Sequence, residues 1–343
     1  MNADTGASIA PYSIHAGDVE RDREIVLGIW RGNLGRAERL PAKYDWFYRQ
    51  CPWGAPLLFL LRHDPSGEWV GAAAIGLRRL QWRGRELRAG ILVDLAVASG
   101  HRTLGPALSL QRALFARAGD DFDVVYGFPN LKAVALVKRV GYVHLADMAR
   151  LSRVLRHAPY LARHLPAPLA RLAGWGVDTW DRLRHGRGER SGPAHEWLDA
   201  ADPRLSAPAV PDKDGSELSS PRDLATLQWR FDRAPGARPR YLRLSDAVGR
   251  TQAWFVCEVD GTSVRVQDLG GTVDAMAIAT LIRAARALGA ASVSVELTVG
   301  DAVWSRAGFV ERARRPIYGR WRETLGDRPL PAQIHFTSAD EDE

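Results

Sequence analysis

The chain has 343 residues, 46% of them hydrophobic and 25% charged, a composition that is typical of a folded protein and excludes disorder throughout. This length exceeds what one hydrophobic core usually supports, so we expect two domains. Two cysteines are too few for a disulfide framework or a four-cysteine zinc site, and much of the net charge of +7 lies in one segment, residues 150–190.

The first 100 residues predict a short strand, two helices and a meander of three strands. Turn sequences at 65–67 and 83–85 separate these strands. The N-terminus lacks the basic and then apolar pattern of a secretory signal, and no run is long enough to span a bilayer, so we expect a cytoplasmic protein. The expected elements are strand 12–16, helix 23–31, an aromatic-rich helix 44–50, and strands 56–63, 68–80 and 86–98.

The most informative stretch joins the last of these strands to a helix. The apolar run 91–97 is followed by Arg102, Gly105 and Ala107 in the spacing Arg-x-x-Gly-x-Ala, and a helix is expected over 105–118. The unpaired N–H groups at a helix N-terminus and the positive end of its dipole favour an anion, and small residues let a ligand approach the main chain. The pattern therefore predicts a phosphate-binding turn.

A second motif follows after a strand expected at 122–126. It consists of Asn130-x-x-Ala133-x-x-Leu136 in a helix over 130–140, followed by Gly141 and Tyr142. A further strand is expected over 142–154. Two ordered motifs carry much more weight than one glycine pattern, which is common by chance.

With these two motifs the chain resembles the GNAT superfamily of acyl-CoA N-acyltransferases. The resemblance implies a mixed α/β sheet, with the turn holding the pyrophosphate of coenzyme A and the strand before it holding the thioester. It further implies direct attack of an amine on acetyl-CoA or another acyl-CoA, with no metal. The cofactor-binding residues that it implies are Leu95, Ala96, Val97, Arg102, Thr103, Leu104, Gly105, Ala107 and Asn130.

Two residues are candidates for proton transfer. Asp94 is the lone charge in its apolar strand, so it is the candidate base or orients the acceptor; the alternative is a structural hydrogen bond at the strand end. Relatives often carry a tyrosine after the Leu136 position, but this chain has Val137, which cannot protonate a thiolate. Tyr126 is then the candidate acid, unless water acts or the thiolate leaves unprotonated.

The segment 150–190 combines nine arginines with leucines and tryptophans, broken by prolines at 159, 166 and 168. It predicts basic amphipathic helices, most simply a connector that packs on the two domains. The alternative is peripheral contact with a membrane surface, where such helices bury an apolar face and place arginines among the headgroups.

Pairs of similar short segments, found in the same order, predict that the chain contains two related units. The segment 46–52 resembles 229–235, Asp94-Leu95 resembles Asp268-Leu269, and 136–142 resembles 303–309. The second unit lacks the phosphate turn, since residues 270–274 lead directly into a helix at 275–288 that Asp274 is expected to cap. We therefore expect two tandem GNAT-like domains, the second degenerate, with a domain at 1–155, a basic helical connector at 156–200, a second domain at 201–330 and a disordered acidic tail at 331–343.

The function expected from the sequence is a coenzyme A-dependent N-acyltransferase acting on a small amine or an amino-sugar or polysaccharide-precursor acceptor, with no nucleic acid partner. Two alternatives stay open. One is an aminoacyl-tRNA-dependent transferase of the peptidoglycan-bridge type, although such relatives generally lack the coenzyme A turn. The other is a protein that binds acyl-CoA without turnover, which Val137 and the uncertain base keep open.

Overall fold

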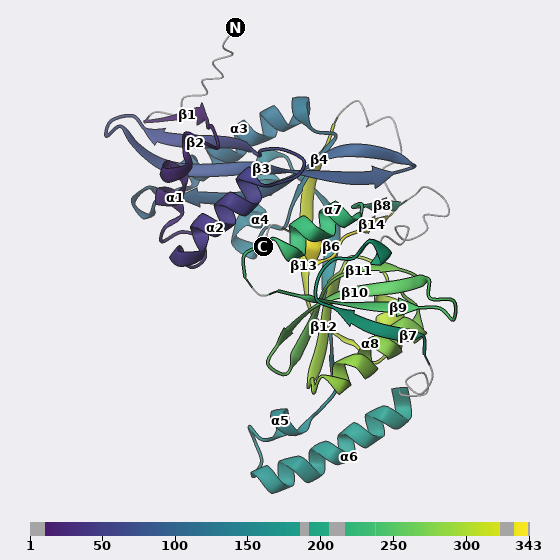
Figure 1. Cartoon of the computed structure of the whole chain (residues 1–343). Helices are drawn as coiled ribbons and strands as arrows, with labels where there is room; N and C mark the ends of the chain where they lie inside the picture. Colours follow the sequence, from purple (N-terminus) through teal and green to yellow (C-terminus); the bar gives the residue numbers. More distant parts are fainter. Residues whose placement is uncertain (1–10, 186–191, 206–216, 237, 323–332, 342–343) are drawn as a thin grey trace.

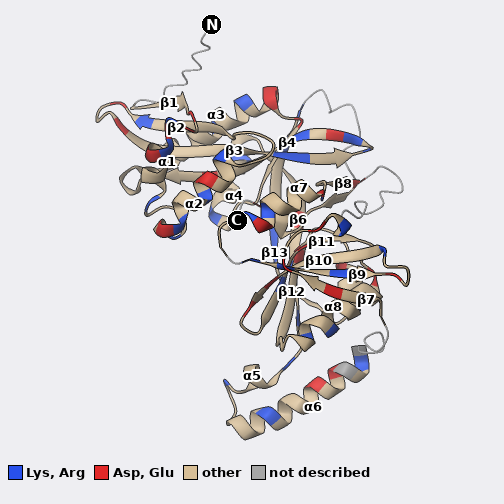
Figure 2. Cartoon of the chain, viewed as in Figure 1, with Lys and Arg blue, Asp and Glu red and all other residues tan. Residues whose placement is uncertain are grey.

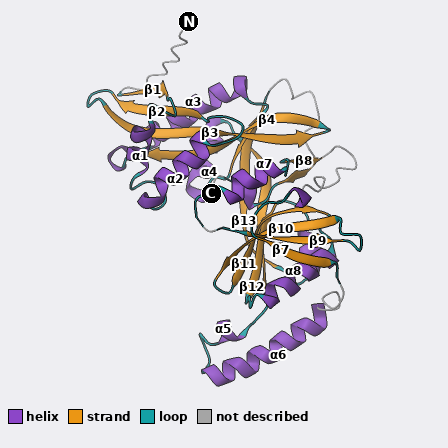
Figure 3. Ribbon diagram, viewed as in Figure 1, coloured by secondary structure: helices purple, strands orange, loops and turns teal. Residues whose placement is uncertain are grey.

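The computed structural model describes residues 11–185, 192–205, 217–236, 238–322 and 333–341. In these residues one mixed sheet runs through both halves of the molecule, and helices cover it (Figures 1 and 3). The main path of the sheet is β1-β2-β3-β4-β5-β13-β6-β12-β11-β10-β9-β7. The predicted α/β class with a mixed sheet is confirmed.

The N-terminal half follows the order expected from the sequence. Its aromatic-rich helix begins earlier than expected and ends in a π-helical turn, labelled η2. The elements are β1 (Tyr12–Ala16), α1 (Arg23–Trp30), α2 (Leu40–Tyr44), η2 (Asp45–Arg49), β2 (Leu57–His63), β3 (Glu68–Trp82), β4 (Arg85–Val97), α3 (Leu104–Asp121), β5 (Val124–Gly127), α4 (Leu131–Val140) and β6 (Val143–Val154).

The C-terminal half repeats this order. Each half has a π-helical turn, a three-strand meander, a helix that crosses to a parallel strand, a second helix and a long last strand. The elements are β7 (Ala194–Leu198), β8 (Glu217–Ser219), α7 (Leu224–Leu227), η6 (Gln228–Asp232), β9 (Arg240–Ser245), β10 (Thr251–Asp260), β11 (Ser263–Gly271), α8 (Ala275–Ala287), β12 (Ser292–Leu297), α9 (Asp301–Arg306), β13 (Val310–Trp321) and β14 (Gln333–His335).

The two halves exchange their last strands. β13 pairs with β5 of the first half, and β6 pairs with β12 of the second half, while β6 and β13 pair with each other at the centre. Ile317 and Tyr318 of β13 therefore lie in the apolar clusters of the first half, and Leu151 of β6 lies in that of the second. Each hydrophobic core is completed by the other half of the chain.

The two π-helical turns meet where the halves face each other. The rings of Trp46 and Trp229 stack with centroids 5.0 Å apart. The Trp46 indole donates to the carbonyl of Trp229 at 2.7 Å, and the Trp229 indole donates to the carbonyl of Trp46 at 3.3 Å. This reciprocal contact between equivalent residues is what a duplicated unit with approximate two-fold symmetry produces.

The predicted connector forms two helices, α5 (Ala158–Leu161) and α6 (Ala167–His185), which extend from the end of β6 as an arm (Figure 1). Residues 186–191 of this segment lie outside the described residues. The strand β7 lies within the range 156–200, and it pairs with β9 at the edge of the sheet. Residues 206–216, which precede β8, also lie outside the described residues.

The expectation of a disordered acidic tail is wrong for residues 333–341. β14 pairs with β8, and Thr337 and Asp340 form a capping box around a short 3₁₀ helix. Phe336 and Asp340 are 1% and 2% exposed. The tail is ordered because its apolar residues reach the core between the halves and because the buried Arg222 pairs with Asp340, neither of which its acidic composition indicates. We call residues 333–341 the C-terminal strap.

Candidate functional site

The predicted phosphate turn joins β4 to α3. After β4 the chain makes a short 3₁₀ turn, and Thr103 is the residue before α3, with no hydrogen bond from its side chain to the first N–H groups of the helix. Arg102, Thr103 and Leu104 are exposed, and a Cβ built on Gly105 has no atom within 4 Å. The first turn of an 18-residue helix is therefore open and has no acidic cap.

The side chain of Arg102 lies against the end of α1. Its Nε donates to the carbonyl of Val97 at 3.2 Å, and its terminal nitrogen donates to the carbonyl of Gly32 at 3.3 Å and to the side chain of Asn33. Arg102 thus fixes the turn to the loop after α1. His101 contacts the hydroxyl of Tyr12 through Nδ1 at 2.9 Å, so its ring faces β1.

The strands β4 and β5 separate next to this turn. Their last paired residues are Ile91 and Tyr126, although β4 continues to Val97. A Cβ built on Gly127 would lie 3.0 Å from Cβ of Leu92, which shows how closely the strands approach before they part. Beyond that point β4 is no longer paired with β5, and this stretch of β4 contains Leu95, Ala96 and Val97.

A β-bulge lies in the same part of β4. Ala72 pairs with Ala96 and Ala74 with Val93, so Asp94 and Leu95 lie opposite a single residue of β3. Asp94 has a φ of 55°, in the left-handed region that non-glycine residues rarely adopt. Bulges and strained residues of this kind occur often beside active sites, where they turn main-chain groups toward a ligand.

The carboxylate of Asp94 is buried and holds two residues of the aromatic-rich helix. Lys43 Nζ lies 2.7 Å from its Oδ1, and the hydroxyl of Tyr48 donates to its Oδ2 at 3.1 Å. The Asp94 side chain is 2% exposed and that of Lys43 18%. The geometry gives Asp94 a positioning role for the bulge and for Lys43; its predicted role as a base stays a prediction.

The other candidate residues lie around the separation of the strands. Tyr126 is fully buried, its hydroxyl donates to the carbonyl of Asp340 at 3.2 Å, and burial raises its pKa. Protonation of a thiolate by Tyr126 would require the C-terminal strap to leave this hydroxyl, so that role also stays a prediction. Asn130 precedes α4 and its side chain accepts from the N–H groups of Lys132 and Ala133. Val137 packs in the apolar cluster against α3.

In the second half, the helix end equivalent to the start of α3 is capped by an acidic side chain. Only residues 272–274 separate β11 from α8, and the side chain of Asp274 accepts from the N–H of Ala277 at 2.8 Å. The prediction that Asp274 caps this helix is confirmed. A carboxylate on the first turn satisfies the helix end and repels a phosphate, so this helix end does not suit an anion.

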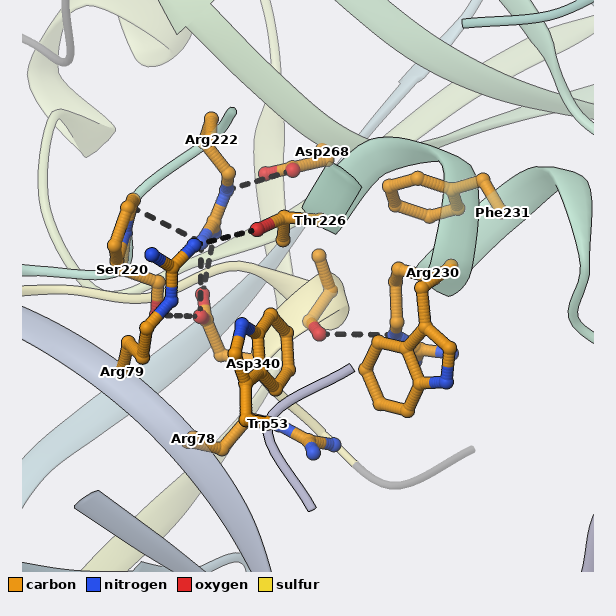
Figure 4. Close-up of a pocket in the computed structure, with 13 residues that line it drawn as sticks. Trp53, Arg78, Arg79, Ser220, Arg222, Thr226, Arg230, Phe231, Asp268 and Asp340 are labelled. Atoms are coloured by element: carbon orange, nitrogen blue, oxygen red, sulfur yellow. Dashed lines mark hydrogen bonds and ion pairs between the residues drawn. The ribbon is translucent and has the colours of Figure 1, made fainter. Parts of the chain in front are cut away.

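A pocket between the halves contains a buried ion cluster around the strap (Figure 4). Arg222 lies 2.7 Å from both Asp268 and Asp340. Burial opposes the charge of Arg222, but the two carboxylates outweigh it and raise its pKa, whereas burial raises the pKa of Asp268. The ion pairs of Arg222 with both carboxylates fix the strap to the second half.

Sequence reasoning did not identify Lys43, Tyr48 or the C-terminal strap as neighbours of the site. Lys43 is separated from Asp94 by 51 positions, and no local pattern pairs them. A signal for the strap was available in Ile334 and Phe336, two apolar residues that alternate before the acidic end. In the described part of the chain, histidine, cysteine and carboxylate side chains form no group of three that could hold a metal ion.

Comparison with solved structures identifies the fold. A conserved protein from Enterococcus faecalis matches with a TM-score of 0.64 and 11% identity, covering 91% of this chain and 72% of that one. A GCN5-related N-acetyltransferase from Kribbella flavida matches with a TM-score of 0.59, 15% identity and the same coverages. Saccharomyces cerevisiae N-myristoyltransferase with bound myristoyl-CoA matches with a TM-score of 0.56 and 11% identity, covering 97% of this chain and 87% of that one.

No family model and no curated protein matches the sequence. At these identities the structural matches establish the fold and leave the activity to be argued from the site. The chain has the GNAT fold of the GCN5-related N-acetyltransferases, as its two motifs predicted.

Proposed function

We propose that the protein is a coenzyme A-dependent N-acyltransferase with one working site, which lies in the N-terminal half, residues 1–155. The observation that carries this proposal is the coincidence of three features at one place: an open helix N-terminus, a bulge with a strained Asp94, and the parting of β4 from β5. The second half shares the fold but has an acid at the equivalent helix end. A duplicated transferase that keeps a single site would have this asymmetry.

In this proposal the cofactor lies along β4 and reaches α3. The main-chain N–H groups of Leu104, Gly105 and Ala107 hold the pyrophosphate, and Pro106 contributes none because its nitrogen carries no hydrogen. Those of Arg102 and Thr103 donate to carbonyls within the turn at 3.4 and 2.7 Å, so they must leave these carbonyls to join the site. The first residues of α3 and α4, Leu104 and Leu131, are 52% and 87% exposed. Apolar side chains beside an anion site suit a ligand that carries both a phosphate and an alkyl arm.

The reaction proposed is direct transfer. The lone pair of an amine attacks the thioester carbonyl carbon, the C–S bond breaks, its electron pair leaves with the coenzyme A sulfur, and the new amide nitrogen loses a proton. Main-chain N–H groups near Leu95, Ala96 and Val97 polarise the carbonyl. Asp94 is the proposed proton acceptor, and to act it must release Lys43 or Tyr48.

The acceptor site that we propose is a polar groove of the second half, beside the end of β5. Its charged and amide side chains include Glu258, Gln267, Glu296, Arg315 and Glu341. The guanidinium of Arg315 lies 5.5 Å from the centre of the Phe128 ring, one residue beyond β5. A groove with alternating acceptors and donors suits an amine that carries hydroxyl groups, such as an amino sugar.

Acetyl-CoA is the simplest donor, although a solved neighbour carries myristoyl-CoA, so acyl length is left to the experiment. We also propose a cytoplasmic location, which is compatible with the two free thiols of Cys51 and Cys257. The pKa of Cys51 is raised by burial, and this disfavours a cysteine nucleophile.

The test combines calorimetry with a thiol-release screen of acetyl-, octanoyl- and myristoyl-CoA against amines and amino sugars. Transfer that falls in Asp94→Asn, with coenzyme A affinity unchanged, supports the proposal. Tight binding with no transfer to any acceptor supports the non-catalytic alternative. Absence of coenzyme A binding overturns the proposal and favours the alternative that uses charged tRNA.

A further inference from the structure

The arm formed by α5 and α6 leaves a large apolar surface uncovered. In Figure 1 the arm lies at the far end of the C-terminal half, away from the candidate site. Leu172 and Trp175 are each 68% exposed, Leu183 is 71% exposed and Trp180 58%. No helix in the described residues has the length and hydropathy of a membrane span.

The exposed apolar residues lie on one side of the arm. At about 100° per residue, Leu169, Leu172, Trp180 and Leu183 of α6 fall within roughly 80° of arc on a helical projection, and the exposed Trp175 and Val177 flank this arc, one on each side. Contiguous apolar surface of this kind on a monomer indicates an interaction site, whereas single exposed leucines do not.

The opposite side of α6 packs on α5 and on the end of β6. Ala170 is buried, and a Cβ added at Gly174 would lie 2.6 Å from the main-chain nitrogen of Ala158. Asp178 lies 2.6 Å from Nδ1 of His157, and Asp181 lies 2.8 Å from the buried guanidinium of Arg153. The helix is therefore held with its apolar side outward.

The same contacts sort the charges. Asp178 and Asp181 are the only acids between 156 and 185, and on the inner side Asp178 contacts the His157 ring while Asp181 pairs with Arg153. The exposed charges of the arm include Arg156, Arg163, Arg171 and Arg184. Figure 2 shows both acids on α6 in red among mostly uncharged residues. The outward surface thus carries apolar groups and positive charge.

We propose that this face of the arm, residues 160–184, docks on an anionic phospholipid bilayer, with α6 lying parallel to the surface. Leucine and tryptophan side chains enter the boundary between headgroups and acyl chains, and arginines contact the phosphates. Charge complementarity favours this occupant, because a second copy on the same face would bring arginines against arginines. The inference is independent of the proposed transferase activity.

The test is flotation of the full-length protein with phosphatidylcholine vesicles and with vesicles containing one third phosphatidylglycerol. We expect binding to the anionic vesicles, at least tenfold weaker binding to the neutral ones, and loss of binding at high salt. Equal binding to both, or binding to neither, would overturn the proposal.

A matched pair of variants tests the surface. Leu172→Glu changes a 68% exposed side chain on the arm, and Val248→Glu changes a 69% exposed side chain in a turn of the second half. We expect Leu172→Glu to reduce the vesicle-bound fraction at least fivefold and Val248→Glu to leave it unchanged, with both thermal midpoints within a few degrees of the parent. A dimer in light scattering that Leu172→Glu dissociates, together with no vesicle binding, would assign the face to a second copy instead.

Discussion

The two halves of the chain share a fold, but the acidic residue at one equivalent position has a different conformation and a different ion-pair partner in each half. Asp94 and Asp268 occupy equivalent places, each near the end of the third meander strand and each buried. Asp94 lies in a bulge with a φ of 55° and pairs with Lys43, whose side chain still reaches solvent. Asp268 pairs with a buried arginine that also binds the C-terminal strap.

This difference shows that the two copies of a duplicated fold can use equivalent residues in different ways. The first half keeps a strained Asp94 and a helix end without a side-chain cap, both of which cost stability. In the second half the equivalent acid is part of a closed ion cluster and the helix end has its own cap. The second half thus has neither the left-handed acid nor the uncapped helix end of the first.

The largest effect on stability is expected from Asp268→Ala. This change leaves the buried Arg222 with Asp340 as its remaining ion-pair partner, and breaking a buried pair costs about 3 kcal/mol or more. Asp94→Ala should cost less, about 2 kcal/mol, because Lys43 can turn to water while the buried hydroxyl of Tyr48 loses this acceptor. Thermal and urea unfolding measure both. An equal loss in the two variants would remove the contrast between the halves.

A second prediction separates the two helix ends by ligand binding. Gly105→Asp places a carboxylate on the first turn of α3, where a Cβ has free space, so stability should hold while phosphate is repelled. We expect the Kd for coenzyme A to rise at least tenfold, about 1.4 kcal/mol, in calorimetry. Met276→Asp, at the equivalent place in α8, is the control and should leave the Kd unchanged. A similar loss in both variants would contradict a single site.

The stacked pair at the junction tests the approximate symmetry. Trp46→Phe and Trp229→Phe each remove one indole hydrogen bond and should each cost about 1 kcal/mol of unfolding free energy. Because the rings stack on each other, the double variant should deviate from additivity by about 0.5 kcal/mol or more. Additive losses would mean that the rings do not couple the halves.

The smallest effect concerns acid sensitivity. The hydrogen bond from Arg23 lowers the pKa of Asp45, whereas the equivalent residue of the second half is Gln228. A lowered pKa gives stability that is present above the ordinary aspartate pKa, near 3.8, and is lost as the pH falls through the folded value. Asp45→Asn should therefore lower the thermal midpoint slightly at pH 7 and leave it unchanged at strongly acidic pH. A decrease of the same size at both pH values would exclude this linkage.

Much of the fold followed from local pattern. The strand at 91–97, the turn at Arg102 to Ala107 and the helix after it read directly from the order of apolar, small and polar residues. The duplicated order of elements followed from the similar segments that contain Trp46 and Trp229 and from those that contain Asp94 and Asp268. These features depend on neighbours within a few residues, which is the range over which periodicity and capping carry information.

What local pattern did not predict depends on contacts between distant segments. Nothing in 310–321 indicates that this strand pairs with 124–127, and nothing near Asp94 indicates Lys43. The acidic end of the chain was expected to be disordered because of its acidic composition, although it contains the apolar residues Ile334 and Phe336. Its order depends on Arg222 and Arg230, more than 100 positions away.

The pairing of β13 with β5 has a consequence for how the protein is made. While a ribosome synthesises the chain, residues 124–127 are in place long before residues 310–321 exist, so the growing polypeptide keeps an open sheet edge through most of translation. Such an edge invites association with other nascent chains. Fragments that stop near residue 155 should therefore aggregate rather than fold, and co-expression of the missing part should rescue them.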